Sequence, residues 1–311
     1  MKINHRSPHK LWKSRFALVS VVLACAGVLV AGGGMAAFAA PSHSKFATVT
    51  IPTPPKDPTV AAMVPASIRK AGSISSAMDA SYPPDEFEAA NGTTIIGMDA
   101  DFSAALGAVM GIKWVDVNVT FDAIIVGLLS NKYAVGNSSF TVTAKREKQV
   151  NFVTYFKAGE GYYVLSASTL KLDNGLMSLC GRTVSVEVGT TEQTDAQTAV
   201  GLCKKAHKTP DTVLSFSNQS EANLAVSSGR AQIGFADSQV AGYIVSQSKG
   251  TFKLDGPAFG VAPYGFAFAK SSTLDEATLA AVKVLMHDGI YMKILAKWGV
   301  QAGAITNPAI V

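Results

Sequence analysis

From residue 71 onward the sequence alternates short apolar runs with amphipathic stretches, in two successive series. Strands that alternate with helices form parallel sheets whose faces the helices cover. At 311 residues the chain is long enough for two such lobes, each with its own core. The sequence therefore predicts a two-lobed α/β protein, with a ligand cleft at the carboxyl ends of the strands.

The first series ends near residue 135. It predicts strands at Ser73 to Met78, at Trp114 to Val117 and near Val135, and a helix at Asp99 to Met110. Thr120 is expected to cap a second helix. The buried face of that helix is predicted to hold Ile124, Ile125, Leu128 and Leu129.

The second series repeats the scheme. Its predicted strands are Thr183 to Val188, Val213 to Phe216, Gln232 to Ala236 and Gly265 to Ala269. Its predicted helices are Thr190 to Lys205, Glu221 to Ser228 and two closing helices that end at Trp298.

The first 39 residues predict an exported protein. They contain five basic and no acidic residues, followed by an apolar run from Phe16 through Val30 and the small-residue sequence Ala37-Phe-Ala39. This order is typical of a secretory signal, with cleavage after Ala39. An uncleaved membrane anchor and a lipid on Cys25 are the alternatives. All three place the folded part outside the cytoplasm, in the periplasm or on the outer face of the membrane.

Charge outside this segment is balanced. Removing its five basic residues leaves 22 of the 27, which equals the 22 acidic residues. A nucleic-acid-binding protein would carry a basic excess on its folded surface, so no nucleic-acid partner is expected.

Cysteine usage agrees with export. Besides Cys25 the chain has only Cys180 and Cys203, an even number in an oxidising compartment, and we expect a disulfide between them. Two buried free thiols are the alternative. No His or third Cys lies at zinc-ligand spacing nearby, so neither a metal site nor a cofactor is predicted. Residues 40 to 70, which are rich in Pro, Thr, Ser and Ala up to about Pro65, are interpreted as a tether.

Several stretches resemble one protein family, the polar-amino-acid solute-binding proteins of ABC transporters. They are Asp79-Ala-Ser-Tyr-Pro-Pro-Asp-Glu-Phe, Ile96-Gly-Met-Asp-Ala-Asp, Phe121-Asp-Ala-Ile-Ile, the run from Ser138 to Phe152, Val188-Gly-Thr-Thr and Phe235-Ala-Asp. The resemblance covers about residues 65 to 300. It implies a type II periplasmic-binding fold, in which each lobe is a mixed, mostly parallel sheet flanked by helices and the ligand lies between the lobes.

The implied organisation is a signal at 1–39, a tether at 40–70, lobe one at 71–159 and 262–311, and lobe two at 160–261. The chain is expected to cross between lobes near Ala158 to Tyr162 and Gly256 to Tyr264. Closure about those crossings would bury the ligand. The implied function is capture of a free polar or basic amino acid, with glutamine or a basic type favoured, for a membrane permease. We expect a monomer.

A buried zwitterion needs a partner for each of its charges. The resemblance implies that Arg146 binds the carboxylate, and its planar fork suits two oxygens. Gly189, Thr190 and Thr191 lie at a helix start, where amides favour an anion, and Gln193 can complete a capping box. An exposed helix charge and an ordinary Thr cap are the alternatives.

The ammonium and side chain have implied partners as well. Asp237 matches the ammonium-binding aspartate, helped by the Ser139 carbonyl and the Thr141 hydroxyl; otherwise Asp237 would be a helix N-cap. Tyr82 and Phe121 would stack on the ligand, although Phe121 could belong to the core. Asp79 would bind the far end of the ligand's side chain and repel a carboxylate there.

Four positions depart from the family pattern: Asn131, Ala134, Asn151 and Gln232. They are interpreted as structural or surface sites.

Two other functions remain as alternatives. The same fold hosts cyclohexadienyl and arogenate dehydratases, and Glu86 and Glu187 are the candidates for a positioned acid. The five His residues lie outside the motifs, so no catalytic triad is predicted and we expect no enzyme. The remaining alternative is a subunit of an amino-acid sensor.

Overall fold

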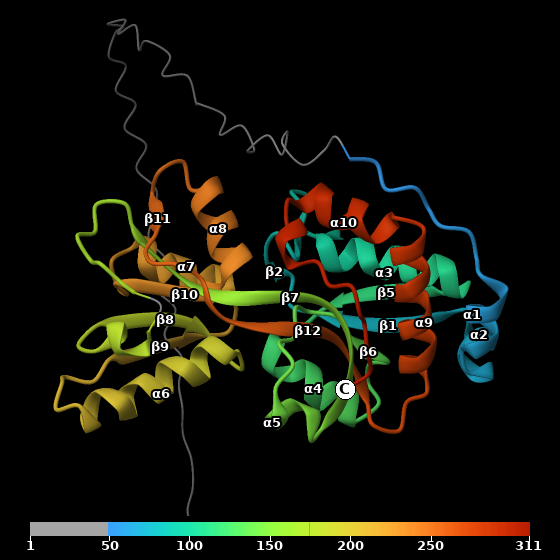
Figure 1. Ribbon diagram of the computed structural model, residues 1–311, viewed down its shortest axis with the longest axis horizontal. Helices are drawn as coiled ribbons and strands as arrows, with labels where there is room; N and C mark the ends of the chain where they lie inside the picture. The colour runs from blue at the N-terminus through green and yellow to red at the C-terminus, as the bar shows by residue number, and fades with distance from the viewer. Residues whose placement is uncertain (1–48, 174) are drawn as a thin grey trace, which may run out of the picture. The chain divides into compact units, whose positions relative to one another are not determined.

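The computed structural model describes residues 49–173 and 175–311, and the predicted signal with Cys25 lies outside them. In this part of the chain, no helix combines the length and the apolar character needed to span a membrane. Two groups of elements lie on either side of two long central strands (Figure 1). We call these groups lobe one and lobe two.

Lobe one is built from two stretches of the chain. Its elements are α1 (Pro58–Met63), α2 (Ala66–Ala71), β1 (Ser73–Met78), β2 (Ser81–Tyr82), β3 (Glu86–Glu88), β4 (Ile95–Ile96), α3 (Met98–Met110), β5 (Lys113–Asn118), α4 (Phe121–Leu129), β6 (Val135–Gly136), α5 (Ala144–Glu147), α9 (Leu274–His287), α10 (Ile290–Trp298) and a final 3₁₀ turn (Gln301–Gly303).

Lobe two lies between those stretches in the sequence. Its elements are a 3₁₀ turn (Leu176–Leu179), β8 (Thr183–Glu187), α6 (Thr191–Lys205), β9 (Thr212–Phe216), α7 (Gln219–Ser227), β10 (Ile233–Asp237), α8 (Ser238–Gln247) and β11 (Phe252–Leu254). Within the described residues, the elements predicted from sequence are present in both lobes, with ends shifted by a few residues.

One continuous sheet runs through both lobes, in the order β5-β1-β6-β12-β7-β10-β8-β9, with β11 paired to β7. Its strands are parallel inside each lobe, where β1 pairs with β5 and β6, and β8 pairs with β9 and β10. The central strands β7 (Val150–Leu165) and β12 (Phe259–Ala269) are antiparallel and carry the chain between the lobes. The segments predicted as crossings, near Ala158 to Tyr162 and Gly256 to Tyr264, overlap these strands.

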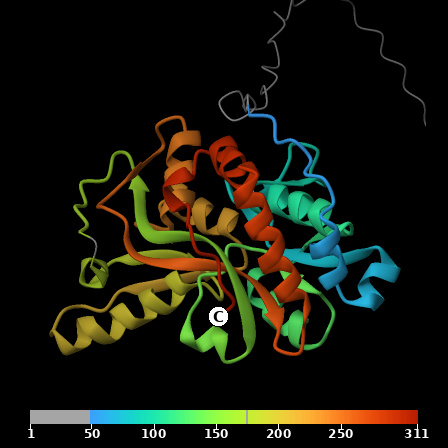
Figure 2. The same ribbon diagram turned by 45° about the vertical axis from the view of Figure 1, so that its right-hand side comes forward.

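Each lobe has its own hydrophobic core. In lobe one, helices α3, α9 and α10 pack together (Figure 2), and Tyr155 stacks on Phe266 with ring centroids 4.0 Å apart. In lobe two, Val184, Val186 and Phe235 are buried between the sheet and its helices. Burial of these apolar surfaces stabilises each lobe and brings the strand ends of both lobes to one cleft.

Helix α4 differs from the prediction at two positions, because Ile125 is only partly buried and Leu129 is exposed. Ile124 and Leu128 are fully buried as expected, but Leu129 is 50% exposed. Ile124 and Leu128 are four residues apart and share one face, whereas Leu129 lies about 100° further round the helix. The predicted buried face was therefore too wide.

The tether prediction is wrong for residues 58 to 70, which form α1 and α2. Asp57 caps α1 by accepting a hydrogen bond from the Val60 amide at 2.9 Å. Val60 and Val64, four residues apart, are buried in the core of lobe one. Pro58, interpreted as part of a disordered arm, occupies the first helical turn, where proline is well tolerated. Residues 49 to 57 form neither helix nor strand.

The predicted disulfide is confirmed: Cys180 and Cys203 are bonded, with their Cα atoms 5.6 Å apart. The bond ties the end of the 3₁₀ turn at Leu176–Leu179 to α6.

Replacing both cysteines with serine is expected to lower the free energy of unfolding by about 3 kcal/mol, because the open loop gains chain entropy in the unfolded state. Denaturant titration of the two proteins measures this difference. Reduced wild-type protein should match the double variant. Equal midpoints for oxidised wild type and variant would contradict the prediction.

Candidate functional site

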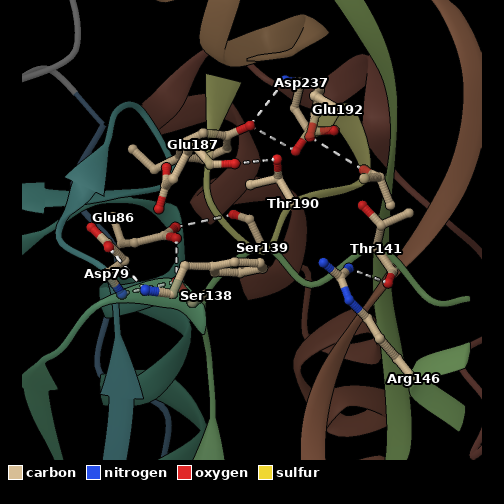
Figure 3. A pocket seen from close by; sticks show the side chains of 13 residues that line it. Asp79, Glu86, Ser138, Ser139, Thr141, Arg146, Glu187, Thr190, Glu192 and Asp237 are labelled. Atoms are coloured by element: carbon tan, nitrogen blue, oxygen red, sulfur yellow. Dashed lines mark hydrogen bonds between the residues drawn. The ribbon is translucent and has the colours of Figure 1, made fainter. Parts of the chain in front are cut away.

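A small cavity lies where the two lobes meet (Figure 3). The lining residues come from both lobes: Asp79, Tyr82, Glu86, Phe121, Ser138, Ser139, Thr141, Arg146, Glu187, Thr190, Thr191, Glu192 and Asp237. Every ligand contact predicted from sequence is among them except Gly189.

Arg146 is held at the cleft by a short helix. Thr143 caps α5 by accepting a hydrogen bond from the Arg146 amide at 3.2 Å. The Arg146 side chain is only 8% exposed, and its guanidinium lies 5.3 Å from the ring centroid of Phe121 and 5.4 Å from that of Phe140. It is therefore a buried cation, and the alternative of an exposed helix charge is wrong.

The Arg146 guanidinium also joins the lobes. Nη1 donates to the Thr141 carbonyl oxygen at 2.7 Å, and Nη2 donates to the Gly189 carbonyl oxygen of lobe two at 3.0 Å. Burial lowers its pKa, while the charges of Glu192 and Asp237 act in the opposite direction. Its other N–H groups are suited to grip a carboxylate.

The loop before α6 approaches lobe one closely. Gly189 has a φ of +86°, and a Cβ placed there would lie 3.0 Å from the Asp122 Cβ. Thr190 caps α6 by accepting from the Gln193 amide at 3.1 Å. Gln193 Oε1 accepts from the Gly189 amide at 2.9 Å, so the predicted capping box closes one residue earlier than expected. Gly189 thus reaches the site through its carbonyl oxygen, because Gln193 occupies its amide.

Asp237 lies at the end of β10 and is 5% exposed. The Tyr82 hydroxyl donates to Asp237 Oδ2 at 3.0 Å and accepts from the Asp237 amide at 2.9 Å. Asp237 occupies the N-cap position of α8, as the alternative expected, but its side chain makes no capping hydrogen bond with that helix. Burial raises the pKa of Asp237 to about 6, although hydrogen bonds from Tyr264 and Tyr82 partly offset that effect.

Tyr82 and Phe121 both line the cavity, but each also has a protein partner. Tyr82 is engaged with Asp237, while Phe121 stacks on Phe140 with ring centroids 4.6 Å apart. Phe121 therefore belongs both to the pocket wall and to the edge of the lobe-one core.

Asp79 follows β1 and is held by the start of α4. Its Oδ2 accepts from the Phe121 amide at 3.0 Å. The Asp79 carboxyl also lines the cavity with that of Glu187 from lobe two, and the Asp79 charge acts on Glu187. Burial raises the pKa of Asp79, and burial together with the Asp79 charge raises the pKa of Glu187 well above its usual value.

A further acidic cluster lies behind Ser139. The Ser139 hydroxyl lies 3.0 Å from Glu86 Oε2 and 3.1 Å from Asp85 Oδ2, and its amide donates to Asp99 Oδ2 at 2.9 Å. The Ser138 hydroxyl donates to Glu86 Oε1 at 2.8 Å. Burial, and then the charge of Asp99, raises the pKa of Asp85 and of Glu86 well above the usual range.

Sequence reasoning did not place four of the lining residues in the ligand site: Glu86, Ser138, Glu187 and Glu192. Glu86 and Glu187 were considered only as catalytic acids. Glu187 ends β8, and Glu192 lies in the first turn of α6. Both flank a loop at the carboxyl end of a parallel strand, which is the position where such sheets bind ligands. That position was the signal that could have identified them.

The four departures from the family pattern lie outside this cavity. Asn151 donates to Asp275 Oδ2 at 2.9 Å, and Gln232 accepts from the Thr183 amide at 3.0 Å. Asn131 has a φ of +58° after α4, and the Ala134 amide donates to the Ser75 carbonyl at 3.1 Å. These are structural roles, as interpreted.

The cavity is strongly acidic. Among the described residues that line it, Arg146 is the one basic side chain, against the carboxyl groups of Asp79, Glu86, Glu187, Glu192 and Asp237. In Figure 3, Glu187, Glu192 and Asp237 gather on one side, Asp79, Glu86 and Ser138 on another, and Arg146 on a third. No group of acidic, His or Cys side chains in the described part of the chain has a metal-binding arrangement. The site can therefore match one anionic group and more than one cationic group.

Comparisons with known proteins agree with this geometry. Residues 74–301 match the family model of bacterial extracellular solute-binding proteins, family 3. The arginine-binding protein ArgT of Corynebacterium glutamicum is 30% identical over 254 residues, which cover 81% of this chain and 83% of ArgT.

Two solved structures are similar in fold and sequence. An ancestral arginine-binding protein bound to arginine has a TM-score of 0.66 and 32% identity, over 73% of this chain and 98% of that chain. The ancestral amino acid-binding protein AncCDT-1, a precursor of cyclohexadienyl dehydratase, has a TM-score of 0.67 and 30% identity, over 75% and 97% of the two chains. These matches confirm the two-lobed fold, and this chain belongs to the bacterial extracellular solute-binding proteins, family 3.

Proposed function

We propose that this protein captures a free cationic amino acid, of the arginine class, outside the cytoplasm and delivers it as a monomer to the permease of an ABC transporter. The observation that carries the proposal is the charge of the cavity, whose lining includes five carboxyl groups and one guanidinium. A cationic amino acid brings one carboxylate and two positive groups. A glutamate ligand would add a second carboxylate to an already acidic site.

Each group of the ligand has a partner in this proposal. Arg146 grips the carboxylate, with Thr190 and Thr191 beside it. Asp237 accepts hydrogen bonds from the α-ammonium, with Ser139 and Thr141 completing its contacts. Asp79 lies at the end of the cavity where the side-chain cation would be read. Because ligand and protein charges are buried together, each pair replaces the water that both partners lose.

The related proteins support this ligand class. ArgT is named for arginine, and one similar structure holds arginine. The acidic residues Glu187 and Glu192 add a reason from this chain itself, since both are buried in the cavity wall.

A thermal-shift screen of ligand-free protein against the twenty amino acids, ornithine and citrulline tests the proposal. A ligand that binds only the folded state raises the melting temperature by mass action. We expect arginine, lysine or ornithine to give the largest shift, glutamine and citrulline a smaller one, and glutamate none. A largest shift with an acidic or apolar amino acid would contradict the proposed ligand class.

Two observations favour the dehydratase alternative: Glu86 and Glu187 both line the cavity, and the chain is similar to AncCDT-1, a precursor of cyclohexadienyl dehydratase. We propose that these acids serve binding and that the protein performs no chemistry. Incubation with prephenate or arogenate, followed by chromatography, should return both compounds unchanged. Formation of an aromatic product by wild type, and its loss in Glu187→Gln, would show that the protein is an enzyme.

Replacing Gly189 with Ala is expected to weaken ligand binding about tenfold. A φ of +86° is unfavourable for alanine, and the added Cβ would contact Asp122 as the lobes close. Titration calorimetry measures the effect on arginine binding. Gly201→Ala is the matched control, because nothing lies within 4 Å of its added Cβ. Equal affinities of the two variants would show that Gly189 does not limit closure.

A further inference from the structure

Two glutamates of lobe two face aspartates across the cavity. Glu187, 2% exposed, lines the cavity with Asp79, and Glu192, 1% exposed, lines it with Asp237. In each pair the charge of one carboxyl group acts on the other. Within the described residues, Oε1 of Glu187 and Oε1 of Glu192 have no hydrogen-bond donor. The cavity therefore contains two carboxyl pairs whose hydrogen-bonding capacity the protein leaves partly unused.

A hydrogen bond between two carboxyl groups requires a proton on one of them. Two ionised carboxylates in a buried site repel each other, so such a pair keeps one proton up to a higher pH than a single carboxylate does. Burial raises the pKa of Glu192 well above its usual value, and the Asp237 charge adds to that effect. Burial likewise raises the pKa of Glu187 well above its usual value, and the Asp79 charge adds to that effect.

The surrounding groups reinforce this state. Glu187 is influenced by the charges of Asp79, Asp122 and Asp237, and it interacts with the Tyr82 hydroxyl. The charged or titratable groups that influence Glu192 are Asp237, Glu160, Arg146 and Tyr82. Of all these, Arg146 alone is a cation, and its guanidinium also contacts two carbonyl oxygens. Arg146 therefore offsets part of the charge on the Glu192–Asp237 pair, whereas the charges that act on Glu187 are all acidic.

We propose that each carboxyl pair holds one proton in the empty closed cavity, and that a cationic amino acid releases these protons as it binds. This inference rests on the proposed function. The α-ammonium takes the place of the proton between Asp237 and Glu192, and the side-chain cation takes the place of the proton between Asp79 and Glu187. Both protons pass to solvent. Glu187 and Glu192 are then ligand contacts that select a second positive charge.

Proton release determines whether affinity for the ligand rises or falls with pH. A carboxyl group whose pKa is raised in the closed state stabilises that state at low pH, and the contribution is lost as the pH rises through the raised pKa. Binding of the cation requires the ionised pair, so affinity for the cation increases with pH. For each proton released per ligand bound, the affinity for the ligand increases about tenfold per pH unit.

Citrulline is the matched ligand for a test, because it has the length and shape of arginine but a neutral urea group. It can displace the proton at Asp237 and Glu192 but not the one at Asp79 and Glu187. Calorimetric titrations near neutral pH, in buffers of different ionisation enthalpy, give the number of protons released. We expect arginine to release about one proton more than citrulline. Equal release for the two ligands, or none for arginine, would overturn the inference.

The Glu187→Gln variant tests whether the excess proton comes from the Asp79–Glu187 pair. Glu187→Gln keeps the size of the side chain and removes its titration, so the difference between arginine and citrulline should vanish. Glu221→Gln, an exposed position on α7, should leave the difference unchanged. Persistence of the difference in Glu187→Gln would also overturn the assignment, and wild-type protein alone decides the matter if that variant does not fold.

These outcomes are separable from those of the proposed function. Absence of arginine binding to folded, ligand-free protein would overturn the proposed function and this inference with it. Arginine binding without excess proton release would leave the proposed function intact and overturn the proton exchange alone.

Discussion

Replacing Arg146 with Ala is expected to raise the Kd for arginine by at least about thirtyfold, or about 2 kcal/mol of binding free energy. The change leaves the buried ligand carboxylate without its cation. It also removes the two hydrogen bonds by which Arg146 joins Thr141 to Gly189 across the cleft. Calorimetric titration of wild type and variant measures the loss.

Agmatine separates the two contributions, because it is arginine without the carboxylate. If Arg146 acts on the carboxylate, agmatine should bind wild type weakly and lose little further affinity in Arg146→Ala. Arg146→Lys should recover part of the arginine affinity, since it restores a charge without the planar fork. An Arg146→Ala variant that binds arginine as wild type does would contradict the placement of the carboxylate.

Replacing Asp79 with Asn is expected to reduce affinity for arginine about tenfold while changing that for citrulline much less. Asn retains an acceptor for the Phe121 amide, which now bonds to Asp79 Oδ2 at 3.0 Å, but it carries no charge for a side-chain cation. The ratio of the two dissociation constants, measured by calorimetry, reports specificity.

Two controls sharpen this test. Asp237→Asn should weaken arginine and citrulline alike, because both ligands present the same α-ammonium. Glu88→Gln, which changes an exposed acid on β3, should alter neither affinity. Equal losses for both ligands in Asp79→Asn and in Asp237→Asn would show that the division of roles between the two aspartates is wrong.

Much of the fold could be predicted because local pattern and tertiary structure agree. The strand at Ser73 to Met78 and the helix that ends at Met110 are present as expected, since residue periodicity and the glycine that follows the helix specify them locally. The exposure of Leu129 and the burial of Val60 and Val64 could not be predicted, because they depend on which neighbour covers each helix face. Packing between segments distant in the sequence decides such details.

In the candidate site, likewise, some residues could be predicted from the sequence and others could not. Arg146 and Asp237 were identified because they lie in sequence runs that resemble a known family. Glu192 was missed because its importance arises only when α6 and β10 bring it next to Asp237. The pairing of Glu187 with Asp79 likewise joins the two lobes, and nothing in either local sequence indicates the other. Charge balance in a cavity is a property of the assembled fold.

The central claim is that this acidic cavity captures a cationic amino acid. Calorimetric titration of folded, ligand-free protein with L-arginine tests it most directly. We expect saturable binding at one site per chain, weaker binding of citrulline and none of glutamate. Absence of binding by arginine, lysine and ornithine, or tighter binding of glutamate than of arginine, would contradict the claim.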